Sequence, residues 1–141
     1  MAAQNQSAME ALGELFIVGI SGLELQSSSA EFLNKSRIGG VIYFAHNYDS
    51  PAQIAELSLA IQKNRPSGSQ PLWLSVDQEG GRVQRFKKGF TKIPEAGTWA
   101  ASGSAQLIFE ISEVIAKELR AVGVNVNYAP VADINTNPKN P

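Results

Sequence analysis

Residues 72–81 of the chain read Leu72-Trp73-Leu74-Ser75-Val76-Asp77-Gln78-Glu79-Gly80-Gly81. The first five form an almost continuous apolar run of strand length, which is typical of a strand covered on both faces in a parallel sheet. The polar residues and the glycine pair that follow end the run. This stretch predicts a buried strand that carries a carboxylate, Asp77, at its carboxyl end.

Three further runs of strand length occur along the chain, of which the first two are also nearly continuous in apolar character, and stretches of helical length separate all four. The other runs cover residues 15–20, 41–45 and 124–129. Alternation of strands and helices is the signature of βαβ units with a parallel sheet. The pattern predicts an α/β fold, a (β/α)8 TIM-type barrel of which only about the first four βα units are present, because a whole barrel takes about 250 residues. We expect residues 1–141 to form one domain with open sheet edges.

The predicted helices have recognisable start and stop signals. Ser28 with Glu31 has the spacing of a capping box. Ser50 followed by Pro51 places a capping serine before a proline that needs no amide hydrogen. A third helix carries an apolar stripe and is expected to stop at Gly123 in a left-handed conformation. That stripe consists of Leu107, Ile108, Ile111, Val114, Ile115, Leu119 and Val122.

Composition and charge exclude several classes of protein. Lysine and arginine together number 12 against 13 acidic residues, so the chain offers no charged surface for nucleic acid or an anionic membrane. Without cysteine it has neither disulfides, nor thiolate zinc sites, nor a cysteine nucleophile. Residues 1–10 lack the apolar core of a signal peptide, and no apolar run approaches the ~20 residues that span a bilayer. We expect a cytoplasmic protein, although removal of a signal peptide would leave the same pattern.

Polar residues follow the predicted strands, where parallel α/β folds gather their functional groups. Asp77 is the strongest candidate, because a carboxylate fixed by the sheet can accept two hydrogen bonds from adjacent sugar hydroxyls. Gly80 and Gly81 allow a sharp turn or a close approach to a ligand. Arg82 is expected to pair with Glu79 or Asp77. The alternative is that the glycines only make a turn and that the carboxylates lie in solvent.

Three segments of the sequence resemble the N-terminal barrel domain of family 3 glycoside hydrolases. They are Gly39 to Phe44, the string Val76-Asp77-Gln78-Glu79-Gly80-Gly81-Arg82-Val83-Gln84-Arg85-Phe86, and Gly123 to Asn135. The similarity is closest to the single-domain bacterial β-N-acetylglucosaminidases. It runs in the same order from about Leu12 to the last residue, so residues 1–141 resemble the N-terminal half of that barrel domain.

The resemblance implies a retaining β-hexosaminidase that removes terminal N-acetylglucosamine from peptidoglycan fragments without a metal or cofactor. Asp77 matches the aspartate that binds sugar hydroxyls in the −1 subsite, and Asp133 matches a position close to that pocket without a defined role. The nucleophile and the acid/base residue are expected beyond Pro141, so the piece alone should be inactive. The implied partner is a small carbohydrate such as an N-acetylglucosaminyl muropeptide. We expect a monomer at full length, whereas the fragment could pair through its open edges.

Other residues have a functional and a purely structural interpretation. His46 invites the role of general acid, but a loop-packing histidine is favoured because it follows the wrong strand for the family. Trp73 is expected in the core, whereas Trp99 has either role. A basic cluster surrounds Phe86 and Phe90 and is interpreted as a solvated loop with two aromatic rings packed under it. That cluster consists of Arg82, Arg85, Lys87, Lys88 and Lys92.

Three alternative functions remain. Family 3 also contains β-glucosidases and β-xylosidases. A half-barrel could instead be a binding or assembly module without activity, which pairs with itself or a partner to cover its edges. A phosphate-binding barrel enzyme is the weakest alternative, because the usual phosphate site follows strands seven and eight rather than the third.

Overall fold

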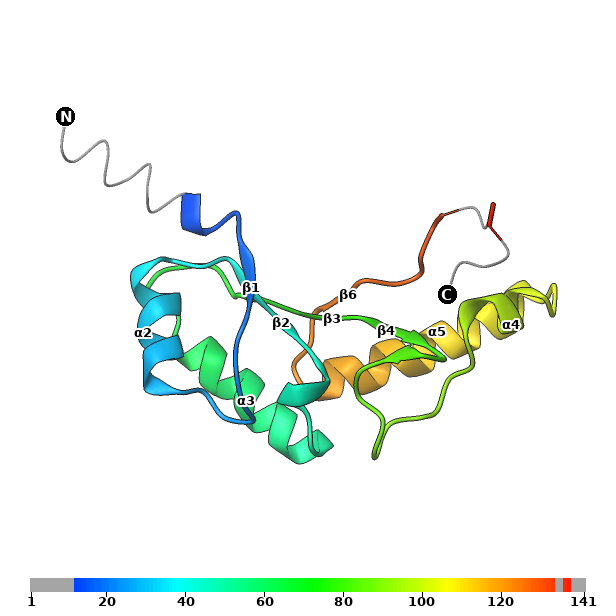
Figure 1. The fold of residues 1–141 in the computed structure, drawn as a ribbon, viewed down its shortest axis with the longest axis horizontal. Coiled ribbons are helices and arrows are strands. Elements are labelled where there is room, and N and C mark those ends of the chain that lie inside the picture. Colours follow the sequence, from blue (N-terminus) through cyan, green and yellow to red (C-terminus); the bar gives the residue numbers. More distant parts are fainter. Residues whose placement is uncertain (1–11, 134–135, 138–141) are drawn as a thin grey trace.

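The computed structural model describes residues 12–133 and 136–137. Its centre is a four-stranded parallel sheet with the strand order β1-β2-β3-β6 (Figure 1). The strands are β1 Ile17–Gly19, β2 Gly40–Tyr43, β3 Trp73–Val76 and β6 Val126–Asn127. Three of them lie inside a predicted apolar run, and β2 begins one residue before its run, at Gly40, which confirms the prediction of a parallel α/β sheet.

Helices connect the strands and lie on one side of the sheet (Figure 1). They are α2 Ser27–Lys35, α3 Pro51–Lys63, α4 Ala96–Ala100 and α5 Ala105–Ala121, with a 3-10 turn, η1, at Ala45–Asn47. A small antiparallel hairpin, β4 Gln78–Gly80 and β5 Val83–Gln84, follows β3 directly. The sequence predicted a turn there but not this hairpin.

Two of the three helix signals act as predicted. The Ser50 side chain caps α3 by accepting a hydrogen bond from the Gln53 amide, and Pro51 is the first helical residue. Gly123 follows α5 with φ +86°, the left-handed conformation that glycine adopts without strain. The capping box at Ser28 is wrong. Helix α2 begins at Ser27 after Gln26 and has no side-chain cap, because Ser28 is already the second residue of the helix. Glu31 pairs with Lys35 one turn later.

The hydrophobic core lies between the sheet and the helices. It contains residues from all three long helices and from strands β2 and β3, namely Leu33, Val41, Tyr43, Ile54, Leu57, Ile61, Leu74, Val76, Ile115 and Leu119. Side chains alternate along a strand, so the strand residues that lie between these core residues point to the opposite face of the sheet. One face of the sheet is therefore buried by helices.

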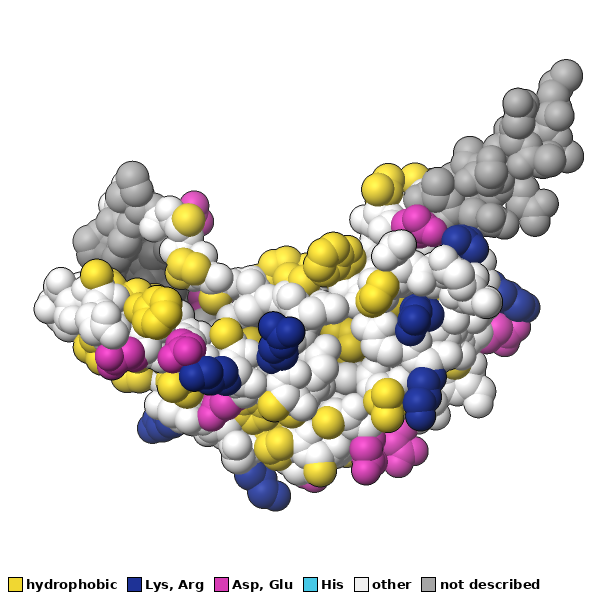
Figure 2. All heavy atoms as spheres, turned by 180° about the vertical axis from the view of Figure 1, so that it is seen from behind, with side chains coloured by type: hydrophobic (Ala, Val, Ile, Leu, Met, Phe, Trp, Pro, Cys, Tyr) yellow, Lys and Arg dark blue, Asp and Glu magenta, His cyan; other side chains and the backbone are white. Residues whose placement is uncertain are grey.

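The opposite face of the sheet is open in the described part of the chain. Trp73 is 56% exposed and Ile17 is 37% exposed, so the prediction of strands covered on both faces, and of Trp73 in the core, is wrong here. Figure 2 shows hydrophobic side chains gathered in the hollow between the two ends of the molecule. The apolar stripe of α5 is likewise half covered, because Ile115 is buried whereas Leu107 and Val114 are exposed.

Candidate functional site

Asp77 lies at the carboxyl end of β3, one residue beyond the last one that pairs with β2. The register joins Tyr43 to Val76, so the next step places Phe44 beside Asp77 on the open face of the sheet. The Tyr128 amide donates a hydrogen bond to the Val76 carbonyl over 3.0 Å, which brings Tyr128 to the same level from β6. The sheet thus sets one carboxylate between two aromatic residues at its carboxyl-terminal edge.

An arginine, but not the expected one, pairs with this carboxylate. Arg85 Nη2 donates a hydrogen bond to Asp77 Oδ2 over 3.2 Å, and both side chains are half-buried. Arg82 is exposed. The prediction that Arg82 pairs with Glu79 or Asp77 is therefore wrong. The hairpin turns the chain back on itself, so the residue eight positions after Asp77 returns to it.

Two buried glutamines hold the loop that carries Arg85. The side-chain amide of Gln78 makes two hydrogen bonds with the Phe86 backbone. Its Nε2 atom donates to the Phe86 carbonyl over 2.9 Å, and its Oε1 atom accepts from the Phe86 amide over 3.0 Å. The side-chain amide of Gln84 donates to the backbone carbonyls of Phe86 and Thr91. It accepts a hydrogen bond from the backbone amide of Ile93. Residues 84 and 86 are thereby fixed on either side of Arg85. The sequence interpretation missed both glutamines, because nothing in their spacing distinguishes them from surface residues.

The glycine pair has a structural reason. Gly80 has φ +94°, and a Cβ atom at this position would lie 2.3 Å from the Pro94 carbonyl oxygen. Gly81 has φ +58° and donates its amide hydrogen to the Ile93 carbonyl over 2.8 Å. The two glycines therefore make the turn of the hairpin and admit the following chain.

Aromatic rings pack beneath the basic loop, as predicted. Phe86 is fully buried and Phe90 nearly so. The Phe86 ring stacks on Tyr48 with a centroid distance of 4.6 Å. The Tyr48 hydroxyl donates a hydrogen bond to the Lys88 carbonyl. Partial burial, and then the nearby Asp49 and Glu118 carboxylates, raise the pKa of Tyr48 above its ordinary value.

His46 packs in the loop after β2. Its ring stacks on Phe44 at a centroid distance of 5.9 Å, and its Nε2 atom lies 3.1 Å from the Ile20 carbonyl oxygen. Asn47, which is fully buried, donates from its side chain to the carbonyls of Ile20 and Gly22. These contacts agree with the loop-packing interpretation of His46.

Asp133 is not brought to Asp77 by any recorded contact. It is exposed and lies in the segment that leaves the sheet after β6. Among the hydrogen bonds and ion pairs of residues 12–133, none joins these two carboxylates. Residues 134–135 and 138–141, which include the last two of the third resemblance segment and the end of the chain, lie outside the described residues.

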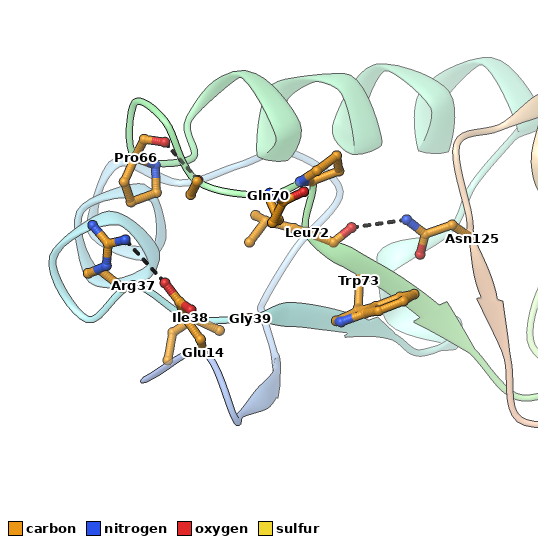
Figure 3. Close-up of a pocket in the computed structure, with 11 residues that line it drawn as sticks. Glu14, Arg37, Ile38, Gly39, Pro66, Gln70, Leu72, Trp73 and Asn125 are labelled. Atoms are coloured by element: carbon orange, nitrogen blue, oxygen red, sulfur yellow. Dashed lines mark hydrogen bonds and ion pairs between the residues drawn. The ribbon is translucent and has the colours of Figure 1, made fainter. Parts of the chain in front are cut away.

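Pockets occur at both ends of the strands. At the amino-terminal end, a pocket of 470 Å³ is lined by Glu14, Arg37 and Trp73 among others (Figure 3). Beside the carboxyl-terminal end, a pocket of 380 Å³ lies between α4, α5 and the segment after β6, and Trp99 and Glu79 line it. Asp77 lines neither of these two pockets.

The described residues contain no group of three acidic or histidine side chains that could hold a metal ion. None of the helices in that part of the chain has the length and apolar character needed to cross a membrane. What the site offers chemically is a carboxylate bonded by a guanidinium, with the Phe44 ring close to that guanidinium. Such a group suits recognition of a neutral polyhydroxy ligand.

Comparison with known proteins gives consistent results. The profile of the glycosyl hydrolase family 3 N terminal domain matches residues 8–141. A beta-hexosaminidase from Nitrosomonas eutropha is 43% identical over 130 residues, which cover 88% of this chain and 36% of that protein. One from Xylella fastidiosa is 37% identical over 126 residues, 85% of this chain and 37% of that protein.

Solved structures agree with the sequences. A family 3 β-N-acetylglucosaminidase from Paenibacillus superposes with a TM-score of 0.88 and 40% identity, over 94% of this chain and 26% of that chain. NagZ from Neisseria gonorrhoeae in complex with N-trifluoroacetyl-D-glucosamine superposes with a TM-score of 0.69 and 30% identity, over 81% of this chain and 35% of that chain. The chain thus spans little more than a third of the length of the curated relatives that it matches.

Proposed function

The chain belongs to glycoside hydrolase family 3, and from that premise we propose that its protein is a β-N-acetylhexosaminidase that removes terminal β-linked N-acetylglucosamine. In this proposal residues 1–141 form the N-terminal half of the barrel domain. Their role is to bind the sugar rather than to break the glycosidic bond.

One observation carries the proposal. The Asp77 carboxylate lies at the carboxyl-terminal edge of a parallel sheet, where barrel enzymes bind their substrates. Arg85 donates a hydrogen bond to its Oδ2 atom over 3.2 Å, and no group in the described part of the chain donates one to Oδ1. Oδ1 can therefore accept a hydrogen bond from a hydroxyl group of the sugar in the −1 subsite.

The geometry indicates how this carboxylate would act. A hydrogen bond to a charged acceptor contributes roughly 1.5–3 kcal/mol, more than a bond between neutral groups. The Arg85 guanidinium fixes the direction in which the free oxygen points. A fixed acceptor orients the sugar ring, and orientation of the reacting bond accelerates the step that follows.

Retaining hydrolysis also needs a nucleophile and a proton donor, commonly two carboxyl groups about 5 Å apart. We assign neither role to a described residue. Asp133 is kept as a candidate on the substrate side without a defined role.

The biological setting is also part of the proposal. We infer a cytoplasmic enzyme acting on N-acetylglucosaminyl muropeptides in peptidoglycan recycling, because that substrate presents a terminal β-linked N-acetylglucosamine. At full length we expect a monomer. Edge pairing through β1 and β6 is expected only where nothing else covers these strands.

A substrate series tests the proposal. The natural full-length protein would be assayed with the 4-nitrophenyl β-glycosides of N-acetylglucosamine, glucose and xylose, and initial rates would be measured at equal concentrations. We expect the N-acetylglucosaminide to be hydrolysed with the highest kcat/KM, with retention of anomeric configuration. A preference for the glucoside or the xyloside would assign the protein to another branch of the family. Absence of hydrolysis of all three would contradict an enzymatic role.

A further inference from the structure

We propose that Phe44 is a positioning residue for the Asp77 site, and that it acts through Arg85. The inference rests on the proposed function, because it concerns the same sugar-binding carboxylate. The decisive juxtaposition is that the Arg85 guanidinium carbon lies 6.0 Å from the centroid of the Phe44 ring, while Arg85 also bonds Asp77.

The buried side chain of Asn47 fixes the Phe44 backbone. The Phe44 amide donates to Asn47 Oδ1 over 2.9 Å, and the Phe44 carbonyl accepts from the Asn47 amide over 2.9 Å. Asn47 is itself anchored to the loop after β1 through Ile20 and Gly22. The aromatic residue is therefore held by two neighbouring strand ends rather than by one loop.

The Phe44 ring has little freedom to move away from its place. A Cβ atom at Gly19 would lie 3.5 Å from the ring, so the ring lies over the glycine that ends β1. The His46 imidazole stacks nearly parallel to it, with an interplanar angle of 13°. Contact with Gly19 and with His46 restricts rotation of the Phe44 ring. A ring that cannot rotate presents its negative face in a fixed direction.

Arg85 needs this second contact. Its Nε atom is buried and has no hydrogen-bond partner within the described residues. Within the described residues the guanidinium makes one polar bond, to Asp77 Oδ2, and a single bond does not by itself fix the plane of the group. A planar guanidinium binds an aromatic face as well as a carboxylate, so Phe44 supplies the constraint that the missing hydrogen bond does not.

The consequence concerns Asp77. When Phe44 fixes Arg85, Asp77 Oδ2 is fixed, and Oδ1 points to the position of the sugar hydroxyl. Without the ring, the same ion pair would sample several orientations, and substrate would bind less tightly. Phe44 thereby acts on substrate binding without contacting the sugar.

A double-mutant cycle in the natural full-length protein tests the inference. The variants are Phe44→Leu, Arg85→Met and the two combined, with KM and kcat measured on 4-nitrophenyl N-acetyl-β-glucosaminide. We expect Phe44→Leu to raise KM about fivefold, in line with a cation–π contact, with kcat changed less than about twofold. In the Arg85→Met background, Phe44→Leu should not raise KM further, because the guanidinium that the ring contacts is absent. If the increase in KM of the double variant equalled the product of the increases in the two single variants, the inference would be overturned.

Two controls separate positioning from packing. Phe44→Tyr keeps the ring and should retain a KM close to that of the unchanged protein. Pentafluorophenylalanine at position 44 keeps the shape of the ring but reverses its charge distribution, so it should raise KM like leucine while the melting temperature stays the same. A normal KM with the fluorinated ring would contradict an interaction between ring and guanidinium.

A nuclear magnetic resonance measurement keeps this inference separate from the proposed function. The Arg85 Nε proton should show a ring-current shift that disappears in Phe44→Leu, whether or not the protein hydrolyses a glycoside. An inactive protein with that shift would overturn the proposed function and retain the contact. An active protein without it would overturn only the contact.

Discussion

Two arginine–carboxylate pairs lie at opposite ends of the parallel sheet, and their surroundings differ. At the amino-terminal end Arg37 bonds Glu14 over 3.1 Å, and the Glu14 side chain is 53% exposed. At the carboxyl-terminal end Arg85 bonds Asp77 over 3.2 Å, and the Asp77 side chain is only 24% exposed. The two arginine side chains are equally exposed, at 32%, and each has a buried Nε atom without a hydrogen-bond partner in the described residues. The difference between the two pairs therefore lies in the carboxylate, which is open to solvent in Glu14 and largely buried in Asp77.

The difference extends to the chain around each pair. At the amino-terminal end, polar side chains such as Gln62 tie backbone segments together close to solvent. At the carboxyl-terminal end, Gln78 and Gln84 do so inside the protein, around a loop that carries Arg85. In barrel enzymes the carboxyl-terminal end serves catalysis and the amino-terminal end serves stability. The proposed sugar-binding role of Asp77 assumes the same division in this chain.

The largest expected effect removes one carboxylate from each pair. We expect Asp77→Asn to lower kcat/KM on 4-nitrophenyl N-acetyl-β-glucosaminide about 100-fold in the natural full-length protein, because a charged acceptor on the sugar is lost. Glu14→Gln is the matched control and should change kcat/KM less than about twofold, since an exposed ion pair contributes little. Equal losses in both variants would remove the distinction between the two ends.

The second comparison uses one glycine from each end, both with positive φ. Gly80→Ala should destabilise the protein by about 3 kcal/mol, because the new methyl group meets the Pro94 carbonyl and the backbone is strained. Gly68 has φ +80° but open space around it, so Gly68→Ala should cost about 1 kcal/mol. Urea unfolding monitored by circular dichroism measures both values. A cost for Gly80→Ala no larger than for Gly68→Ala would argue against the close approach of the hairpin to residue 94.

The third comparison concerns the glutamine side chains at the two ends. Gln84→Leu leaves the Thr91 carbonyl and the Ile93 amide without their partner inside the protein, whereas the Phe86 carbonyl keeps its bond from Gln78, and the change should cost about 2 kcal/mol. Gln62→Leu removes two bonds to Leu72 in a partly solvated position, where water replaces them, and should cost about 1 kcal/mol. Hydrogen exchange should then show faster exchange of the Ile93 amide in Gln84→Leu only. Unchanged exchange would mean that other contacts hold the loop.

The smallest effect appears at alkaline pH. Tyr43, near the carboxyl end of β2, donates or accepts a 3.0 Å hydrogen bond with Ser58, and burial raises the pKa of Tyr43 to about 12. The unfolded chain releases this proton near pH 10, so stability is full below pH 10 and is lost as the pH rises towards 12. At pH 11 the loss should be about 1 kcal/mol relative to pH 9, and Tyr43→Phe should lack that part of the loss. The same pH dependence in both proteins would show that Tyr43 ionises normally.

Local signals in the sequence predicted much of the fold. The apolar runs located all four strands of the parallel sheet, because at least one face of the sheet packs against the helices. The Ser50 cap was also predicted, since its partner is three residues away. Ser28 has the same spacing to Glu31, yet the glutamate pairs with Lys35, which the capping rule does not consider.

The site was predictable only in part. The position of Asp77 follows from strand geometry, but the choice of Arg85 over Arg82 depends on the hairpin that follows the strand. Contacts that join distant segments, such as the Phe44 ring with Arg85, leave no periodic pattern in the sequence. The exposure of Trp73 likewise depends on what covers the open face of the sheet. The apolar residues next to Trp73 in the sequence do not indicate whether that face is covered.

The most direct test of the account is a crystal structure of the natural full-length protein with N-acetylglucosamine bound. We predict a sugar hydroxyl at about 2.7 Å from the Asp77 carboxylate, on the oxygen that Arg85 leaves free. A sugar bound in the pocket at Glu14 and Arg37, or at the carboxyl-terminal end without contact to Asp77, would contradict the central claim.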